Sequence, residues 1–216
     1  MKRISLLVVS AALFAFGCPQ ILRAQTQTPV APDEKQGMPP RKHTGIFTLY
    51  ALDPLSCTLC FEDGKDGMAI ANNLWGNRCS DLSYSLAGSG TFVSGIEVNR
   101  LAAFVDLGNG NELRERYGYE DADNGGVGFA SLRLEGGKIT ILQEDNTKPI
   151  WQPLKEGPQL FSDLKASANV PIKLGHIYLL RIADARDRNF QRIIKLMVIG
   201  YRPDEAVTLR WELLSK

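Results

Sequence analysis

Histidine is scarce in this 216-residue chain, which contains only His43 and His176. Neither has a recognisable partner for nucleophilic catalysis, and His176, which opens an apolar run after Gly175, reads as a structural residue. There is no Gly-x-Ser-x-Gly nucleophile elbow and no glycine-rich phosphate loop between a strand and a helix. The sequence therefore predicts no catalytic residues, no cofactor and no bound metal.

An excess of charge is missing as well, since 25 basic side chains stand against 24 acidic ones. Residues 1–24 hold three of the basic side chains and none of the acidic ones, so the remainder carries a net charge of −2. A protein that binds nucleic acid electrostatically needs a basic stripe to neutralise phosphates. The charge balance therefore excludes nucleic acid as an expected partner.

The chain also lacks an apolar run long enough to span a bilayer comfortably. The longest, Ile4–Gly17, has 14 uncharged residues and follows Lys2 and Arg3. A short apolar run behind a positive start is typical of a secretory signal peptide. We expect residues 1–24 to be this signal, with cleavage after Ala24 and export to the periplasm or the extracellular space.

A second cleavage rule competes with the first. The segment "AFGC" resembles the lipoprotein box of bacteria and would make Cys18 a lipidated first residue. Ala15 stands where leucine is usual, and Pro19 follows the cysteine. In this alternative the protein reaches a membrane only through its lipid anchor.

Residues 25–42 are rich in proline and glutamine and contain no aromatic residue. Such a segment cannot bury enough apolar surface to offset the entropy lost on ordering, so we expect a disordered tether. Residues 43–216 then form a single β-rich domain, which is long enough for a core of its own.

Within this domain, apolar residues recur with a period of two. The run "ASLRLEGGKITIL" reads as a hairpin that turns at Gly136-Gly137, and "AVTLRWELL" reads as a half-buried strand with Trp211 in the core. Ala102–Leu107 reads as a strand that turns at Asn109-Gly110 into a polar partner strand. Each pattern indicates an antiparallel sheet.

Two longer runs, Ile177–Ile182 and Ile193–Ile199, are apolar on both faces and belong in the middle of a sheet or between layers. Only Met68–Trp75 and the segment after Pro158 look helical. Eight to eleven strands with so little helix predict an all-β fold. We expect an antiparallel β-sandwich or open barrel with one or two short helices and one disulfide-stapled loop.

Three of the four cysteines, Cys57, Cys60 and Cys79, lie within 23 residues of one another. The favoured interpretation is a disulfide from Cys79 to Cys57 or Cys60, which closes a loop of roughly 20 residues and is worth about 3 kcal/mol. A zinc site needs a fourth ligand that no local spacing selects. Thiol–disulfide exchange through Cys57 and Cys60 needs a helix after the motif, and the glycines and acids of "FEDGKDG" oppose one.

The remaining candidate site is the segment from Tyr117 to Asp123. Tyr117 and Tyr119 would share a strand face beside Glu120, Asp121 and Asp123. Aromatic faces with neighbouring carboxylates bind sugars by stacking and hydrogen bonding. The same three acids could instead serve a metal-assisted or carboxylate-dependent hydrolase, although they depart from the EF-hand pattern.

Near the C-terminus, the segments "LGHIYLLRIADARD", "IKLMVIGY" and "VTLRWELL" resemble secreted bacterial β modules of uncharacterised function. The resemblance covers Leu174–Leu214 and rests on a Gly-His-x-Tyr-x-x-Arg hairpin and a closing Leu-x-Trp strand. It implies an exported bacterial sandwich and no catalytic residue. The sequence thus favours a non-enzymatic envelope or secreted module whose partner is a glycan or another envelope component. Hydrolysis and thiol–disulfide exchange are the alternatives.

Overall fold

The computed structural model describes residues 43–53, 56–67, 79–84, 90–97, 99–118, 129–144, 149–162 and 168–215. All of them belong to one compact unit. They form thirteen strands and two short helices, and every strand pairing is antiparallel. Among these residues, no helix has the length and apolar character that a membrane span requires. The expected all-β fold is confirmed.

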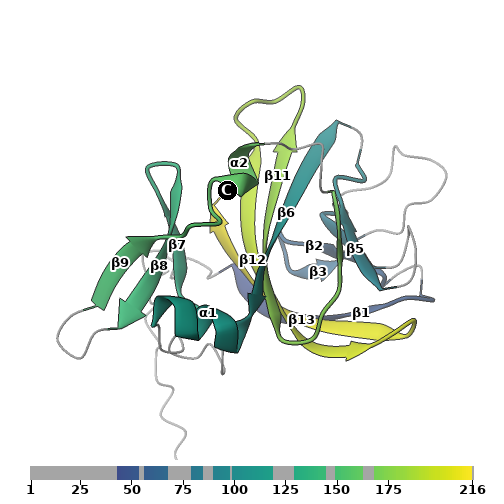
Figure 1. The fold of residues 1–216 in the computed structure, drawn as a ribbon. Helices are drawn as coiled ribbons and strands as arrows, with labels where there is room; N and C mark the ends of the chain where they lie inside the picture. Colours follow the sequence, from purple (N-terminus) through teal and green to yellow (C-terminus); the bar gives the residue numbers. More distant parts are fainter. Residues whose placement is uncertain are drawn as a thin grey trace, which may run out of the picture. The chain divides into compact units, whose positions relative to one another are not determined.

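Sheet A is the largest sheet and contains the longest strands (Figure 1). Its five strands, in spatial order, are β1 (Thr44–Tyr50), β13 (Ala206–Ser215), β12 (Gln191–Arg202), β11 (His176–Asp184) and β6 (Arg100–Asn109). The two runs expected in the middle of a sheet are β11 and β12, and both lie between neighbours. The half-buried strand expected at the C-terminus is β13, in which Trp211 is 4% exposed.

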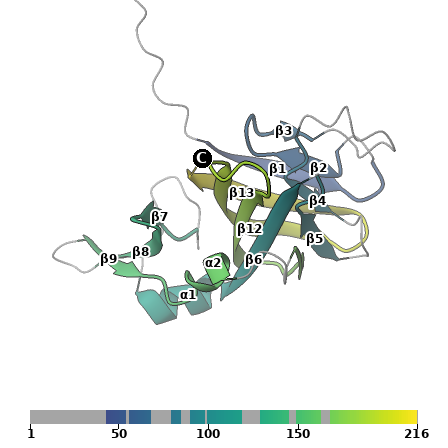
Figure 2. The same ribbon diagram turned by 90° about the horizontal axis from the view of Figure 1, so that it is seen from above.

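Two smaller sheets and two helices complete the domain (Figures 1 and 2). Sheet B consists of β10 (Asn169–Pro171), β5 (Thr91–Ser94), β4 (Leu82–Tyr84), β2 (Thr58–Cys60) and β3 (Lys65–Asp66). Sheet C consists of β7 (Leu132–Glu135), β8 (Lys138–Glu144) and β9 (Pro149–Pro153). The helices are α1 (Gly110–Tyr117) and α2 (Gln159–Ser162). Thirteen strands exceed the eight to eleven expected because four strands have only two or three residues, too few to show a period in the sequence.

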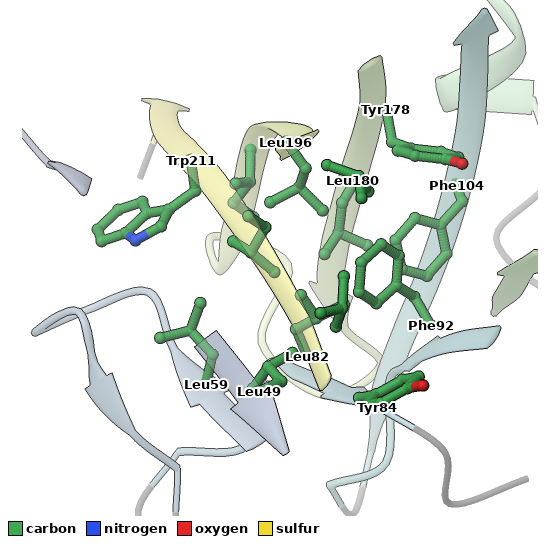
Figure 3. Close-up of a cluster of buried hydrophobic side chains, with 14 of the residues drawn as sticks. Leu49, Leu59, Leu82, Tyr84, Phe92, Phe104, Tyr178, Leu180, Leu196 and Trp211 are labelled. Atoms are coloured by element: carbon green, nitrogen blue, oxygen red, sulfur yellow. The ribbon is translucent and has the colours of Figure 1, made fainter. Parts of the chain in front are cut away.

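Sheet A has a core on each of its faces, because side chains on a strand alternate between the two sides. The first core lies between sheets A and B; Tyr178 and Leu180 of β11 enter it, and Figure 3 shows much of it. The second core lies between sheet A and the layer made by α1, α2 and sheet C, and Ile177 and Leu179 enter it. The strand that is apolar on both faces is therefore buried on both faces.

The hairpin at Gly136-Gly137 is confirmed as β7 and β8. Leu132 pairs with Ile141, and Leu134 pairs with Ile139, so the apolar residues of both strands share the face that packs into the second core. Gly136 and Gly137 have φ values of 54° and 77°, a left-handed conformation that glycine adopts without strain.

The expected hairpin at Asn109-Gly110 is wrong, because β6 leads directly into α1. The Asn109 side chain accepts a hydrogen bond from the Asn111 N–H, and Glu112 reaches back to the Asn109 N–H, which together form a capping box. Gly118, with φ 61°, ends the helix in a left-handed conformation. An Asn-Gly pair usually predicts a turn. Here Glu112, three residues after Asn109, completes the capping box and so favours a helix.

The second expected helix, after Pro158, is confirmed as α2. The signal peptide, Cys18, the tether and the expected helix at Met68–Trp75 lie outside the described residues. They stay predictions.

Candidate functional site

An apolar pocket of about 520 Å³ lies where the turn end of the β7–β8 hairpin meets β9 and α2. Ile139 and Leu154, each 2% exposed, belong to the second core and also line the pocket. The rest of the lining comes from Gly137, Lys138, Pro153, Gly157, Pro158, Phe161 and Ser162. Ligand sites in proteins are usually concave and mostly apolar, with volumes of about 300–1,000 Å³. The pocket falls within this class.

Helix α2 supplies one wall of the pocket through Phe161 and Ser162. Leu160, which precedes them, is fully buried and packs into the second core, which anchors the helix on sheet A. The guanidinium carbon of Arg181, on β11, lies 5.1 Å from the centre of the Phe161 ring. The aromatic wall is therefore braced from sheet A rather than held by its own short helix alone.

Tyr117 holds the loop that forms another wall. Its hydroxyl donates to Glu156 Oε2 at 2.7 Å and accepts from the Lys155 N–H at 3.0 Å. Burial raises the pKa of Tyr117, so the hydroxyl keeps the proton that it donates. Arg116 forms an ion pair with the other oxygen of Glu156. The end of α1 thus fixes the loop from Leu154 to Gly157 against the pocket.

This placement corrects the expected role of Tyr117 as half of an exposed stacking face. The side chain is 4% exposed and lies at the end of a helix rather than on a strand, so its ring has no open face for a sugar. Tyr119, Glu120, Asp121 and Asp123 lie outside the described residues, and their roles in glycan binding or hydrolysis stay predictions. Trp151, the partly buried tryptophan of β9, is covered on one face by the Arg133 guanidinium at 3.8 Å.

His176, the first residue of β11, hydrogen-bonds to the carboxylate of Asp106 on the neighbouring strand β6. Its Nδ1 lies 2.9 Å from Asp106 Oδ1, and Lys173 Nζ lies 3.2 Å from Asp106 Oδ2. Burial alone would raise the pKa of Asp106, but the hydrogen bonds from His176, Gly108 N–H and Lys173 outweigh it and lower the pKa. Among the described residues, the His176 ring hydrogen-bonds to Asp106 and lies beside the ring of Tyr178, whose hydroxyl donates instead to the Pro171 carbonyl. The pair joins β6 to β11, which agrees with a structural histidine.

The disulfide joins Cys60 to Cys79, one of the two pairings expected, and Cys57 is buried outside it. Thr58–Cys60 is a strand, and the Cys57 carbonyl continues its pairing by accepting from the Tyr84 N–H. Three residues of extended chain place Cys57 and Cys60 about 10 Å apart, on opposite faces. A disulfide requires Cα atoms within about 7 Å. The geometry therefore opposes exchange through the Cys-x-x-Cys pair.

Cys60, Cys79 and Asp81 are the one group of potential metal ligands within the described part of the chain, with ligand atoms within 4.8 Å of one another. Both sulfurs are bonded to each other, and Asp81 accepts from Arg192 Nη1 at 2.7 Å and from the Phe61 N–H at 2.9 Å. Burial raises the pKa of Asp81, and Arg192 partly opposes this. A guanidinium fills the position that a cation would take, so the group does not fit a metal.

The pocket was not predicted from the sequence. Its lining comes from three separate segments, and the available signals were the Gly-Gly turn, the two prolines around Leu154 and the apolar residues after Pro158. Comparison of the chain with protein-family models, with curated proteins and with solved structures finds no match.

Proposed function

We propose that this protein is an exported, non-catalytic binding module and that its ligand site is the apolar pocket beside α2. The pocket supports this proposal, because two of its lining residues, Ile139 and Leu154, belong to the second core. Contacts of Arg181 and Tyr117 hold its walls in place. A pocket with such fixed walls needs little ordering when it binds, which favours affinity.

The chemistry of the lining indicates the ligand class. Leucine, isoleucine, phenylalanine and proline side chains offer apolar surface, and the lining also includes one cationic residue, the exposed Lys138. An amphiphile with an apolar body and an anionic head matches both features. Envelope lipids and their acyl fragments are ligands of this kind, so the proposal keeps an envelope component as the partner and replaces stacking on a sugar.

Export and the absence of catalysis rest on separate grounds. The short apolar run behind Lys2 and Arg3 is typical of a signal peptide, and a disulfide suits an oxidising compartment. Among the described residues, His176 is bonded to a carboxylate and a lysine ammonium lies beside it, with no nucleophile in the pair.

The test uses 1-anilinonaphthalene-8-sulfonate as a fluorescent apolar anion and dodecanoate as its competitor. Ser162→Trp places an indole at the pocket rim, and Gln159→Trp adds the same side chain to an exposed position of the same helix outside the lining. We expect saturable binding by the wild type and by Gln159→Trp, and an affinity reduced by about tenfold or more in Ser162→Trp.

Two results would overturn the proposal. One is a wild-type protein that binds neither probe saturably. The other is equal binding by the two tryptophan variants, which would place the probe elsewhere on the surface. Retention on a cell-wall glycan fraction by a protein that fails to bind dodecanoate would favour the sugar-binding hypothesis instead.

A further inference from the structure

Edge strands expose unpaired backbone groups, and natural proteins shield them with charges, prolines, bulges or short length. In the described part of the chain, five of the six edge strands are shielded. β3 is two charged residues, β10 is three residues ending in Pro171, and β7 carries Arg133 and Glu135. β9 begins and ends with proline, and β6 carries charged residues and an irregular register with β11.

The sixth edge strand, β1, has none of these devices. Its seven residues, "TGIFTLY", include no charge and no proline, and its register with β13 runs without a shift. Ile46 and Tyr50 are 65% and 50% exposed, although both belong to residue types that are usually buried or half-buried. The strand is therefore uncharged and regularly paired along its whole length, and it exposes two large side chains on one face.

The hydrogen bonds of β1 show which backbone groups face outward. His43 accepts from the Leu213 N–H at one end of the ladder, and the Ala51 N–H donates to Glu205 at the other. Since bonding alternates along an antiparallel pair, the odd-numbered residues bond to β13 and the even-numbered ones point away from it. Among the described residues, the only backbone bond recorded on that outer side joins the Tyr50 N–H to the Ser56 carbonyl.

Thr44, Ile46 and Thr48 thus present a row of outward N–H and C=O groups. The hydroxyls of both threonines are already engaged within sheet A, Thr44 with the Trp211 carbonyl at 2.7 Å and Thr48 with Thr208 at 2.9 Å. The groups that remain for hydrogen bonding at this edge are therefore the backbone N–H and C=O groups. All three residues are β-branched, a side-chain type that favours strands.

We propose that β1 pairs with β1 of a second copy of this chain, antiparallel and with a two-fold axis at Ile46. This register places Ile46 against its own copy and Thr44 against Thr48, so each outward group meets its complement. It joins two five-stranded sheets into one. An interface of this type is isologous, the commonest arrangement in homodimers.

A second copy fits better than an unrelated strand for two reasons. The outward row is complementary to itself about Ile46, and a β1 from another copy brings no charge that would need a partner. The Ser56–Tyr50 bond closes the row at its far end, which limits pairing to the segment centred on the proposed axis. The edge is separate from the apolar pocket, so this inference does not depend on the proposed ligand.

The experiment is sedimentation equilibrium of the purified chain over about 1 μM to 1 mM, the range in which small interfaces dissociate. Ile46→Lys places a charge in the row, a natural way of shielding an edge. Ile199→Lys is the matched control, because Ile199 is 43% exposed on β12, inside the same sheet and away from its edge.

We expect a dimer for the wild type and for Ile199→Lys, and a shift to monomer by at least about tenfold in the dissociation constant for Ile46→Lys. Thermal unfolding of the variants at a concentration where all are monomeric separates loss of pairing from loss of folding. In hydrogen exchange of the wild type, the Ile46 and Thr48 amides should become protected as the dimer forms. A wild-type monomer throughout the range, or a dimer that Ile199→Lys disrupts and Ile46→Lys does not, would overturn the proposal.

Discussion

The two faces of sheet A differ in how completely they are closed. Against sheet B, aromatic rings pack edge to face, and the ring centres of Phe61 and Trp211 are 5.3 Å apart. Those of Phe92 and Tyr178, both labelled in Figure 3, are 6.0 Å apart. Against α1, α2 and sheet C, the second core is mostly aliphatic, borders the buried ammonium of Lys195, and continues into the apolar pocket. One face is thus a packed interior, and the other opens in part into a pocket.

Under the proposed function, this difference separates the part of the domain that stabilises the fold from the part that binds the ligand. The packed face can carry most of the folding free energy, because its apolar surface is closed on both sides. The other face then accommodates the pocket and the Lys195–Glu212 ion pair, both of which contribute less to stability.

Leu180 and Leu179 are adjacent on β11, fully buried, and face the first and second core, respectively. We expect Leu180→Ala to lower the free energy of unfolding by about 4 kcal/mol and Leu179→Ala by about 2.5 kcal/mol, because a layer beside a pocket can relax into the space created. Urea denaturation measures both. Equal losses would mean that the two faces are packed equally well.

The disulfide contributes to the packed face only. Replacing both Cys60 and Cys79 by serine should lower the free energy of unfolding by about 3 kcal/mol, since the closed loop spans 19 residues in sequence. Binding of the apolar probe should be unchanged at temperatures where the variant is folded. A loss of probe affinity without unfolding would show that the two faces communicate.

The cap of α1 supports the other face. Asn109→Ala removes the hydrogen bond to the Asn111 N–H and should cost about 1 kcal/mol. Because α1 positions Tyr117 and, through it, the loop from Leu154 to Gly157, we expect weaker probe binding as well. Asn189→Ala, at an exposed position of the β11–β12 turn, is the control for removing an asparagine, and it should leave probe binding intact.

Lys195 should give the smallest effect at neutral pH. Its ammonium lies 2.6 Å from Glu212 Oε2, donates to the Ala130 carbonyl, and is 3.8 Å from the centre of the Phe129 ring. Glu212 is 41% exposed, so its carboxylate stays solvated without its partner, and Lys195→Met removes the cost of burying the ammonium. Lys195→Met should therefore be about as stable as the wild type in urea denaturation at pH 7.

The pH dependence of this pair distinguishes it from a neutral contact. Burial lowers the pKa of Lys195, and Glu212 partly opposes this. The folded chain therefore binds this proton more weakly than the unfolded chain, so the stability of the wild type should gain as pH rises from the lowered pKa to the ordinary value of about 10.4. Lys195→Met should lack that gain. Identical profiles would mean that burial does not perturb the lysine.

Periodicity predicted β6, β11, β12 and β13 of sheet A and the β7–β8 hairpin, because burial on one or both faces leaves a direct trace in the sequence. Pro158 indicated the start of α2, and β1 was not predicted. Periodicity failed for β2, β3, β4 and β10, which are too short to show a period. It also failed at Asn109-Gly110, where a turn signal and a capping signal coincide. The deciding residue, Glu112, stands three positions later.

The candidate site was less predictable than the fold. Tyr117 was identified as important for its aromatic ring, whereas its hydroxyl and the loop beyond Leu154 determine its role. The pocket depends on a contact between α2 and a hairpin turn more than twenty residues earlier, and no local pattern records such a contact. The disulfide was predictable in kind, although two pairings were open until the strand geometry separated Cys57 from Cys60.

One consequence of the two-faced strand β11 concerns how the domain opens. Tyr178 and Leu180 hold one core, Ile177 and Leu179 hold the other, and β6 and β12 pair with its two sides. If either core unfolds, one face of β11 becomes exposed to solvent. Because the other core packs on the opposite face of the same strand, it is destabilised as well. The two layers therefore melt as one cooperative unit, and the amides of β11 exchange with solvent only through global unfolding.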